Sequence, residues 1–172
     1  IAEGAVNEEG RTRNKTYSLA PLVSWQKTYV LGGGSAEDQV WREDLAPLLG
    51  KMPENVMNIW HYGFTEMFNN VLDHSGGTVV AIVLTKTPAS PAVRIVDNGV
   101  GIFKKIQSAL ALVDERHAVL ELAKGKCTTD PARHSGEGIF FTSRMFDQFA
   151  IMSGGVYFSH ESDESEDWIL QA

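Results

Sequence analysis

The sequence predicts an α+β fold, a two-layer α/β sandwich in which one mixed β-sheet carries helices on one face. Three observations lead to this prediction. Apolar residues recur at three- and four-residue intervals over 54–74, which is typical of an amphipathic helix. Residues 78–84 and 92–97 are β-branched runs typical of buried strands. Strands and helices mix without the strict βαβ alternation of a parallel sheet.

The composition is that of a soluble globular protein with one sizeable domain. The 172 residues carry a net charge of −7, which argues against a broad nucleic-acid-binding surface. The longest apolar runs are far too short to cross a bilayer, so we expect no membrane-spanning segment. The lone cysteine, Cys127, cannot form an internal disulfide, which favours a reducing, cytoplasmic setting.

The first half of the chain contains four expected segments. Residues 1–20 indicate a helix end and then two short strands around a polar, basic turn, and 22–31 is a longer strand. A helix follows over 37–49, with its last turn disturbed by Pro47. The next helix begins with a proline and covers 53–74, where Ser-Gly-Gly ends it.

The second half begins with two strands, 78–84 and 92–97. Helical spacing returns at about 105–124, with a glycine as the stop signal. The apolar run 139–146 is compatible with a helix. Residues 148–170 contain the last strands, which are joined by Gly-Gly and by an acidic turn.

A polar stripe accompanies the apolar face of the helix expected over 53–74. Glu66, Asn70 and Asp73 are spaced i, i+4, i+7 and therefore share one line on the helix surface, with Asn69 slightly off that line. At the margin of a core, a carboxylate and a carboxamide form a polar wall for a bound molecule. Such residues also decorate solvent-facing helix edges, so this motif alone leaves both interpretations open.

A second motif follows the strand at 92–97. That strand places Asp97 at its end, and Asn98-Gly99-Val100-Gly101 then forms a tight turn in which backbone can approach a ligand closely. An ionised carboxylate only accepts hydrogen bonds, so Asp97 suits an exocyclic amine such as that of adenine. A plain β-turn explains the same residues.

The third motif is HSGEGIFFTSRMF, in which Gly136 and Gly138 precede an apolar run. Backbone amides at the start of a helix, left uncovered by glycine, can bind phosphate. Gly-x-Gly before a helix is common, however, and is weak support by itself.

Together, in this order, the three motifs resemble the ATP-binding domain of the GHKL superfamily, which includes gyrase-type topoisomerases, histidine kinases, mismatch-repair ATPases and anti-sigma-factor kinases. FTEMFNNVLDHS resembles the N box, DNGVGI the first glycine box and SGEGIFFTSRMF the second. The resemblance covers residues 21–172 and implies the sandwich fold of that family (the Bergerat fold) with ATP and Mg²⁺ as ligands. The N box is most similar to that of the anti-sigma-factor serine kinases.

The resemblance also implies individual roles. Asn70 would hold Mg²⁺ through its side-chain oxygen, and Glu66 would act as the catalytic residue that orients or deprotonates the nucleophile. Asp97 would accept the adenine amine. The remaining expected nucleotide contacts come from the end of the N box and from the two glycine boxes: Asp73, Gly99, Gly101, Ile102, Gly136, Gly138 and Thr142.

The segment between the glycine boxes is long and would form a lid that contains the helix at 105–124. Its cations are candidate phosphate contacts, although for each one singly a solvated surface charge is the favoured explanation: Lys104, Lys105, Lys124, Lys126 and Arg133. Glu137 places a negative charge between two glycines of a phosphate site, so we expect it to point outward.

The implied partner is a protein, either a sigma-factor-type regulator or another phosphoacceptor. Residues 1–20 resemble the end of a recognition helix and the wing of a winged helix-turn-helix, which implies DNA contact through an N-terminal domain. A plain hairpin explains them equally well. Two alternatives to a kinase or ATPase follow, namely a non-catalytic nucleotide-sensing domain of a transcriptional regulator and the catalytic domain of a sensor histidine kinase.

Overall fold

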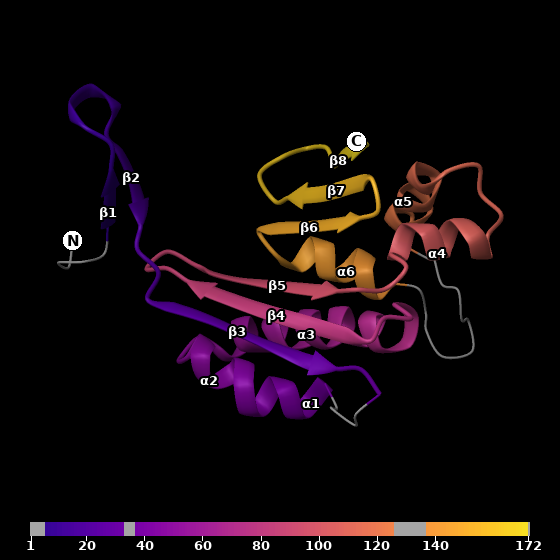
Figure 1. Cartoon of the computed structure of the whole chain (residues 1–172), viewed down its shortest axis with the longest axis horizontal. Helices are drawn as coiled ribbons and strands as arrows, with labels where there is room; N and C mark the ends of the chain where they lie inside the picture. The colour runs from indigo at the N-terminus through magenta and orange to yellow at the C-terminus, as the bar shows by residue number, and fades with distance from the viewer. Residues whose placement is uncertain (1–5, 33–36, 126–136, 172) are drawn as a thin grey trace.

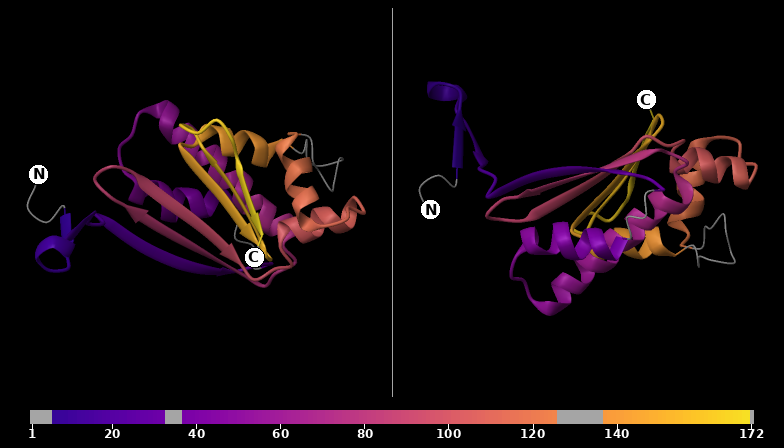
Figure 2. Two further views of the ribbon diagram at one scale, coloured as in Figure 1. Left: turned by 90° about the horizontal axis from the view of Figure 1, so that it is seen from above. Right: turned by 60° about the horizontal axis from the view of Figure 1, so that its bottom comes forward.

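The computed structural model describes residues 6–32, 37–125 and 137–171, which form a mixed α+β architecture. Their strands make three separate antiparallel sheets, one with two strands and two with three. In the right-hand view of Figure 2, helices α1–α3 and α6 lie on one side of both three-stranded sheets. The α+β class is therefore confirmed. The expected single mixed sheet is not found, because every strand pairing in the described ranges is antiparallel and no ladder joins β5 to β6.

The first sheet is an isolated hairpin of β1 (Val6–Glu9) and β2 (Thr16–Leu19), connected through a single 3₁₀ turn, η1 (Thr12–Asn14). It projects away from the body of the molecule (Figures 1 and 2). Every residue from 6 to 19 is exposed. The prediction of two short strands around a basic turn is confirmed.

The second sheet has the order β3 (Val23–Val30), β4 (Val79–Lys86) and β5 (Pro91–Asp97). The central strand alternates fully buried Val80, Ile82 and Leu84 with less buried neighbours, as expected for a strand with one face on a core. In the register, Val80 lies opposite Asp97, so the second motif begins beside the buried start of β4.

Helix α3 (Glu54–His74) covers this sheet, and its buried side chains include Phe64, Phe68 and Val71. Its ends agree with the prediction, except that Pro53 is the capping residue and not the first helical residue. No helix within the described ranges combines the length and the apolar character that a bilayer span requires.

The helix predicted over 37–49 consists of α1 (Glu37–Val40), a π-helical turn η2 (Trp41–Leu45) and α2 (Ala46–Leu49). Pro47 lacks an N–H and cannot complete the regular ladder, so the disturbance lies just before it.

The helix predicted over 105–124 is wrong as a single element. The structure has α4 (Ile102–Ala109) and α5 (Glu115–Ala123) instead. Ala111 adopts a positive φ of 50°, and the Asp114 carboxylate accepts the backbone N–H of His117, which starts a new helix. The apolar periodicity continues across this break, which explains why the sequence pattern looked continuous.

The third sheet has the order β6 (Gln148–Ser153), β7 (Val156–Glu161) and β8 (Trp168–Gln171), which confirms the predicted C-terminal strands. It packs with α4 and α5 around a second hydrophobic core that includes Phe103, Val119 and Phe158. Helix α6 (Gly138–Met145) bridges the two cores, because Ile139 packs on the second core while Phe146 contacts Trp60 of α3 at 4.8 Å between ring centroids.

Candidate functional site

The polar stripe of α3 lies in the middle and last turns of the helix. Glu66 and Asn70 are half-buried, and Asp73 is exposed. The Asn70 Nδ2 donates to the backbone oxygen of Glu66 at 2.9 Å, so the amide is held against its own helix. The Asn70 Oδ1 has no hydrogen-bond partner in the described part of the chain. A fixed side-chain oxygen is thereby left available to a ligand.

The start of α6 lies directly against this stripe. A Cβ built on Gly138 would overlap the Glu66 Oε2, so the Glu66 carboxylate lies directly against the first residue of α6. Burial, with the nearby carboxylates of Glu66 and Glu137, raises the pKa of the Tyr62 hydroxyl. Glu137 is half-buried, and its expected outward orientation stays a prediction.

The turn after β5 is fastened to the end of α3. Gly99 N–H donates to the Asp97 Oδ1 at 2.8 Å, and Val100 N–H donates to the Ser75 carbonyl oxygen at 2.9 Å. A Cβ on Gly99 would overlap that same Ser75 oxygen, which explains the glycine. The Asp97 Oδ2 keeps no partner among the described residues. One acceptor of this half-buried carboxylate thus remains free.

The Asn98 side chain completes this turn. Its Oδ1 accepts the backbone N–H groups of Thr78 and Val79 at 2.8 and 3.1 Å, and its Nδ2 donates to the Thr78 hydroxyl at 2.9 Å. These bonds connect the turn to the start of β4. They fix the direction of the Asp97–Gly101 backbone without using the Asp97 carboxylate.

The remaining candidates of the first glycine box begin α4. Gly101 has a φ of 85°, and a Cβ built on it would overlap the Ser153 hydroxyl at the end of β6. Ile102 is half-buried and packs against the second core. Both residues therefore shape the junction between β5, α4 and β6.

Thr142 is the buried candidate of the second glycine box. It is 1% exposed, its methyl group faces Gly63 of α3, and its hydroxyl has no hydrogen-bond partner in the described residues. A buried hydroxyl without a partner costs free energy, so such atoms mark positions where water or a ligand is expected. Gly136 lies outside the described residues.

The three lid cations that the structure describes are each hydrogen-bonded to a group other than the candidate side chains. Lys105 Nζ donates to the His74 carbonyl oxygen at 2.7 Å, so it caps the end of α3. Lys104 Nζ donates to Gln107 at 3.3 Å and Lys124 Nζ to Glu121 at 2.5 Å. Lys126 and Arg133 lie outside the described residues.

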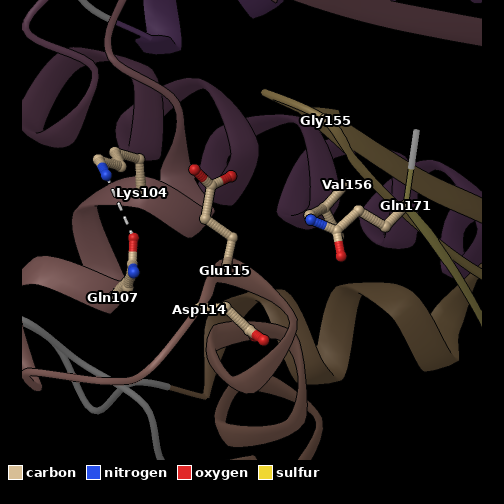
Figure 3. Close-up of a pocket in the computed structure, with 7 residues that line it drawn as sticks. All are labelled: Lys104, Gln107, Asp114, Glu115, Gly155, Val156 and Gln171. Atoms are coloured by element: carbon tan, nitrogen blue, oxygen red, sulfur yellow. Dashed lines mark hydrogen bonds between the residues drawn. The ribbon is translucent and has the colours of Figure 1, made fainter.

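A separate hollow of about 220 Å³ lies between α4, α5 and the third sheet (Figure 3). The close-up shows the Glu115 carboxylate extending between Lys104 and the β7 side of the hollow. Of the sequence-predicted candidates, the lid cation Lys104 lines it, whereas the candidates of the N box and the glycine boxes do not. Its lining consists of Lys104, Gln107, Asp114, Glu115, Gly155, Val156 and Gln171.

No sequence pattern points to a polar cluster that the structure forms between α6 and the third sheet. The Arg144 Nη1 and Nη2 donate to the two Asp167 carboxylate oxygens at 3.0 and 2.7 Å. The His160 Nδ1 lies 2.8 Å from the Asp167 Oδ1 and 2.5 Å from the Arg144 Nη1. Burial acts to raise the pKa of the Asp167 carboxyl, but hydrogen bonds from Arg144 and His160 outweigh it and hold that pKa below its ordinary value.

The donor chemistry on α3 fits Mg²⁺ better than a metal held by protein alone. Among the described residues, no three acidic, histidine or cysteine side chains gather into a metal-binding group. Mg²⁺ usually takes one or two protein oxygens and keeps waters and phosphate oxygens as its other ligands, so the Asn70 Oδ1 is a sufficient protein contribution. In comparisons with protein-family models, curated proteins and solved structures, nothing matches this chain.

Proposed function

We propose that residues 21–172 form an ATP- and Mg²⁺-binding signalling domain of the histidine-kinase-like ATPase (GHKL) type, with the two-layer sandwich of that family. One observation supports this most strongly. Three motifs that are far apart in the sequence are joined by direct contacts around the second half of α3. Gly138 lies against Glu66, and the turn that follows Asp97 is hydrogen-bonded to Ser75.

The binding roles follow from the atoms left free. The Asn70 Oδ1 binds the metal, while its amide nitrogen stays bonded to the helix backbone. Bound Mg²⁺ supplies charge neutralisation for the phosphates. The Asp97 Oδ2 accepts the exocyclic amine of adenine, because its other oxygen is already used by Gly99.

The other candidates surround these two anchors. Asp73 lies on the adenine side of the helix. Gly99, Gly101 and Ile102 form the floor under the base, and Gly138 with Thr142 faces the phosphates from α6. Gly138 belongs to the first turn of α6, where free backbone N–H groups favour anions.

Phosphoryl transfer to a protein partner, a sigma-factor-type regulator or another phosphoacceptor, is the activity that we propose for this domain. The reaction requires mainly positioning and charge stabilisation. Glu66 is the proposed base, because a half-buried carboxylate next to the nucleotide can orient a hydroxyl nucleophile and accept its proton.

Titration calorimetry with ADP tests the binding proposal. We expect saturable heat in the presence of Mg²⁺, weaker binding with a chelator, and weaker binding of GDP than of ADP. Absence of both heat and thermal shift at millimolar nucleotide would end the proposal, whatever the state of the hairpin or the lid.

The β1–β2 hairpin favours a second candidate, a nucleotide-sensing domain of a transcriptional regulator that transfers no phosphate. Its turn exposes Arg11 and Arg13, and such cations commonly contact the DNA backbone. The discriminating variant is Glu66→Gln. Loss of turnover with retained ADP binding supports the enzyme, whereas a protein that binds ATP without any turnover supports the sensor.

A third alternative, the catalytic domain of a sensor histidine kinase, additionally requires a phosphoacceptor histidine on a helix outside this domain.

A further inference from the structure

The Arg144–His160–Asp167 cluster fastens the last turn of α6 to the third sheet. Arg144 lies on α6, His160 on β7 and Asp167 just before β8. The exposed fractions of the His160 and Asp167 side chains are 11% and 19%, so the contact is largely protected from water. The Arg144 side chain, 39% exposed, enters it from the solvent side.

The Nδ1 of His160 contacts both Arg144 and Asp167, but one contact requires a lone pair on this nitrogen and the other requires a proton. Arg144 can only donate a hydrogen bond, so the contact between its Nη1 and the His160 Nδ1 at 2.5 Å requires a lone pair on Nδ1. Ionised Asp167 can only accept, so its contact with the same Nδ1 at 2.8 Å requires a proton there. Both bonds cannot exist at once. Neutral His160 can accept from Arg144 only as the tautomer whose proton is on Nε2, whereas the imidazolium carries a proton on both nitrogens and can only donate.

We propose that His160 is a protonation-controlled latch on α6. With Nδ1 unprotonated, His160 accepts from Arg144, and Arg144 holds Asp167 with both of its terminal nitrogens. When His160 takes up a proton from solvent, its Nδ1–H donates to Asp167 and the imidazolium repels the guanidinium. Asp167 then remains bonded to β7, while Arg144 and the last turn of α6 are released.

The surrounding charges support this exchange of partners. In the described ranges, the charged side chains that contact His160 are Arg144 from α6 and Asp167 from the segment before β8. The adjacent strand β6 places the uncharged Phe149 opposite His160. Glu161 follows His160 directly in the chain, and Asp147 precedes β6 and accepts the backbone N–H of Ser162 with its carbonyl oxygen. Because hydrogen bonds keep the pKa of Asp167 low, this carboxylate stays ionised over the range in which histidines gain a proton.

The latch has a functional consequence because of where α6 begins. Its first residue lies against Glu66, and Thr142 lies one turn later. Release of Arg144 therefore loosens the helix that carries the proposed phosphate contacts, and nucleotide binding weakens as the pH falls. This consequence rests on the proposed function, whereas the latch itself does not.

Amide hydrogen exchange of the whole chain without nucleotide tests the latch directly. Rates for residues 139–145 are compared at about pH 7.5 and about pH 5.5, the range over which histidine changes charge, after correction for intrinsic exchange. We expect protection of α6 to fall roughly tenfold at the lower pH, because a charge-assisted hydrogen bond is lost.

Variants give the test its specificity. In His160→Asn the side-chain oxygen can still accept from Arg144 but does not titrate, so α6 protection should be independent of pH. Arg144→Lys loses the paired contact, so α6 should be less protected even at the higher pH. His117→Gln is the matched control, because His117 pairs with Asp114 on α5, away from α6, and its loss should leave the wild-type pH dependence intact.

Two results would overturn the latch: equal α6 protection at both pH values in the unaltered protein, or an undiminished pH dependence in His160→Asn. ADP titrations at the same two pH values separate this inference from the proposed function. Failure to bind ADP at either pH would contradict the proposed function, but it would not change what the hydrogen-exchange result says about the latch. ADP affinity that stays constant while α6 protection changes removes only the functional consequence.

Discussion

The backbone N–H of Val100 donates to the carbonyl oxygen of Ser75 across 2.9 Å, so the turn that contains Asp97 is attached to the helix that carries Asn70. The segments that carry the two side chains are thereby joined directly at the end of α3. The first two predictions concern these two proposed anchors.

Replacing Asn70 with alanine should remove the Mg²⁺ dependence of nucleotide binding. The Asn70 Oδ1 is free while its Nδ2 is bonded to the helix, so the substitution deletes the proposed metal ligand and costs one local bond. Calorimetry with ADP, with and without Mg²⁺, measures the effect. Asn69→Ala is the matched control and should keep the Mg²⁺ dependence. Similar losses in both variants would contradict the role of Asn70.

Asp97→Asn should weaken ATP binding by roughly 10- to 100-fold, the range for a lost hydrogen bond to a charged group, and GTP binding much less. The free Oδ2 of Asp97 is the proposed acceptor of the adenine amine, which GTP lacks at that position. Competition titrations of the two nucleotides give the ratio. Asp163→Asn in the exposed acidic turn controls for charge. Equal affinities for ATP and GTP in the parent protein would contradict the assignment.

Gly138→Ala should lower the free energy of unfolding by up to about 1 kcal/mol, the low end for overpacking, because its Cβ would overlap the Glu66 carboxylate, which is the far end of a flexible side chain and can move aside. In a Glu66→Ala background the same substitution should cost much less, since the obstructing oxygen is gone. Denaturant unfolding of the four proteins in this cycle measures the difference. An identical cost in both backgrounds would show that the two residues are not in contact.

Asp167→Asn should destabilise the protein at neutral pH by about 1 kcal/mol, a typical value for partly exposed charged hydrogen bonds. The folded-state pKa of Asp167 is held below its ordinary value, so its contribution is complete above that value and is lost as the pH falls through the folded-state pKa. The stability difference between parent and variant should therefore disappear in strong acid. Denaturant unfolding across pH measures it, and a difference that grows as the pH falls would refute the linkage.

Local patterns in the sequence predicted the elements whose burial is periodic. The three- and four-residue spacing of α3 survives in its buried Phe64, Phe68 and Val71, and the β-branched run of β4 alternates as expected. The same helical spacing placed Glu66 and Asn70 one turn apart on α3, and the structure adds that Glu66 lies against the start of α6. The contacts of the three motifs with one another depend on tertiary packing, and the resemblance, not the periodicity, suggested them.

Features that depend on partners far along the chain could not be read from local patterns. The sheet to which a strand belongs depends on its pairing partners. The residues of β5 and β6 therefore could not show that these two strands belong to different sheets. Arg144 and Asp167 are 23 positions apart, and their pairing has no periodic signal. The break between α4 and α5 did have a local signal, because Asp114 is a good capping residue, but the continuous apolar spacing concealed it.

The hydrophobic side chains fall into two clusters, one under α3 and one between α4, α5 and β7, with α6 spanning the division. The boundary between these two clusters forms a seam between two halves of the structure, one built on α3 and the other on α4, α5 and β7. The two halves are joined by α6 and also by the hydrogen bond from Lys105 of α4 to the His74 carbonyl oxygen at the end of α3, so the stiffness of this seam depends on both. We therefore expect substitutions that loosen α6 to reduce the rigidity between the two halves before either half unfolds.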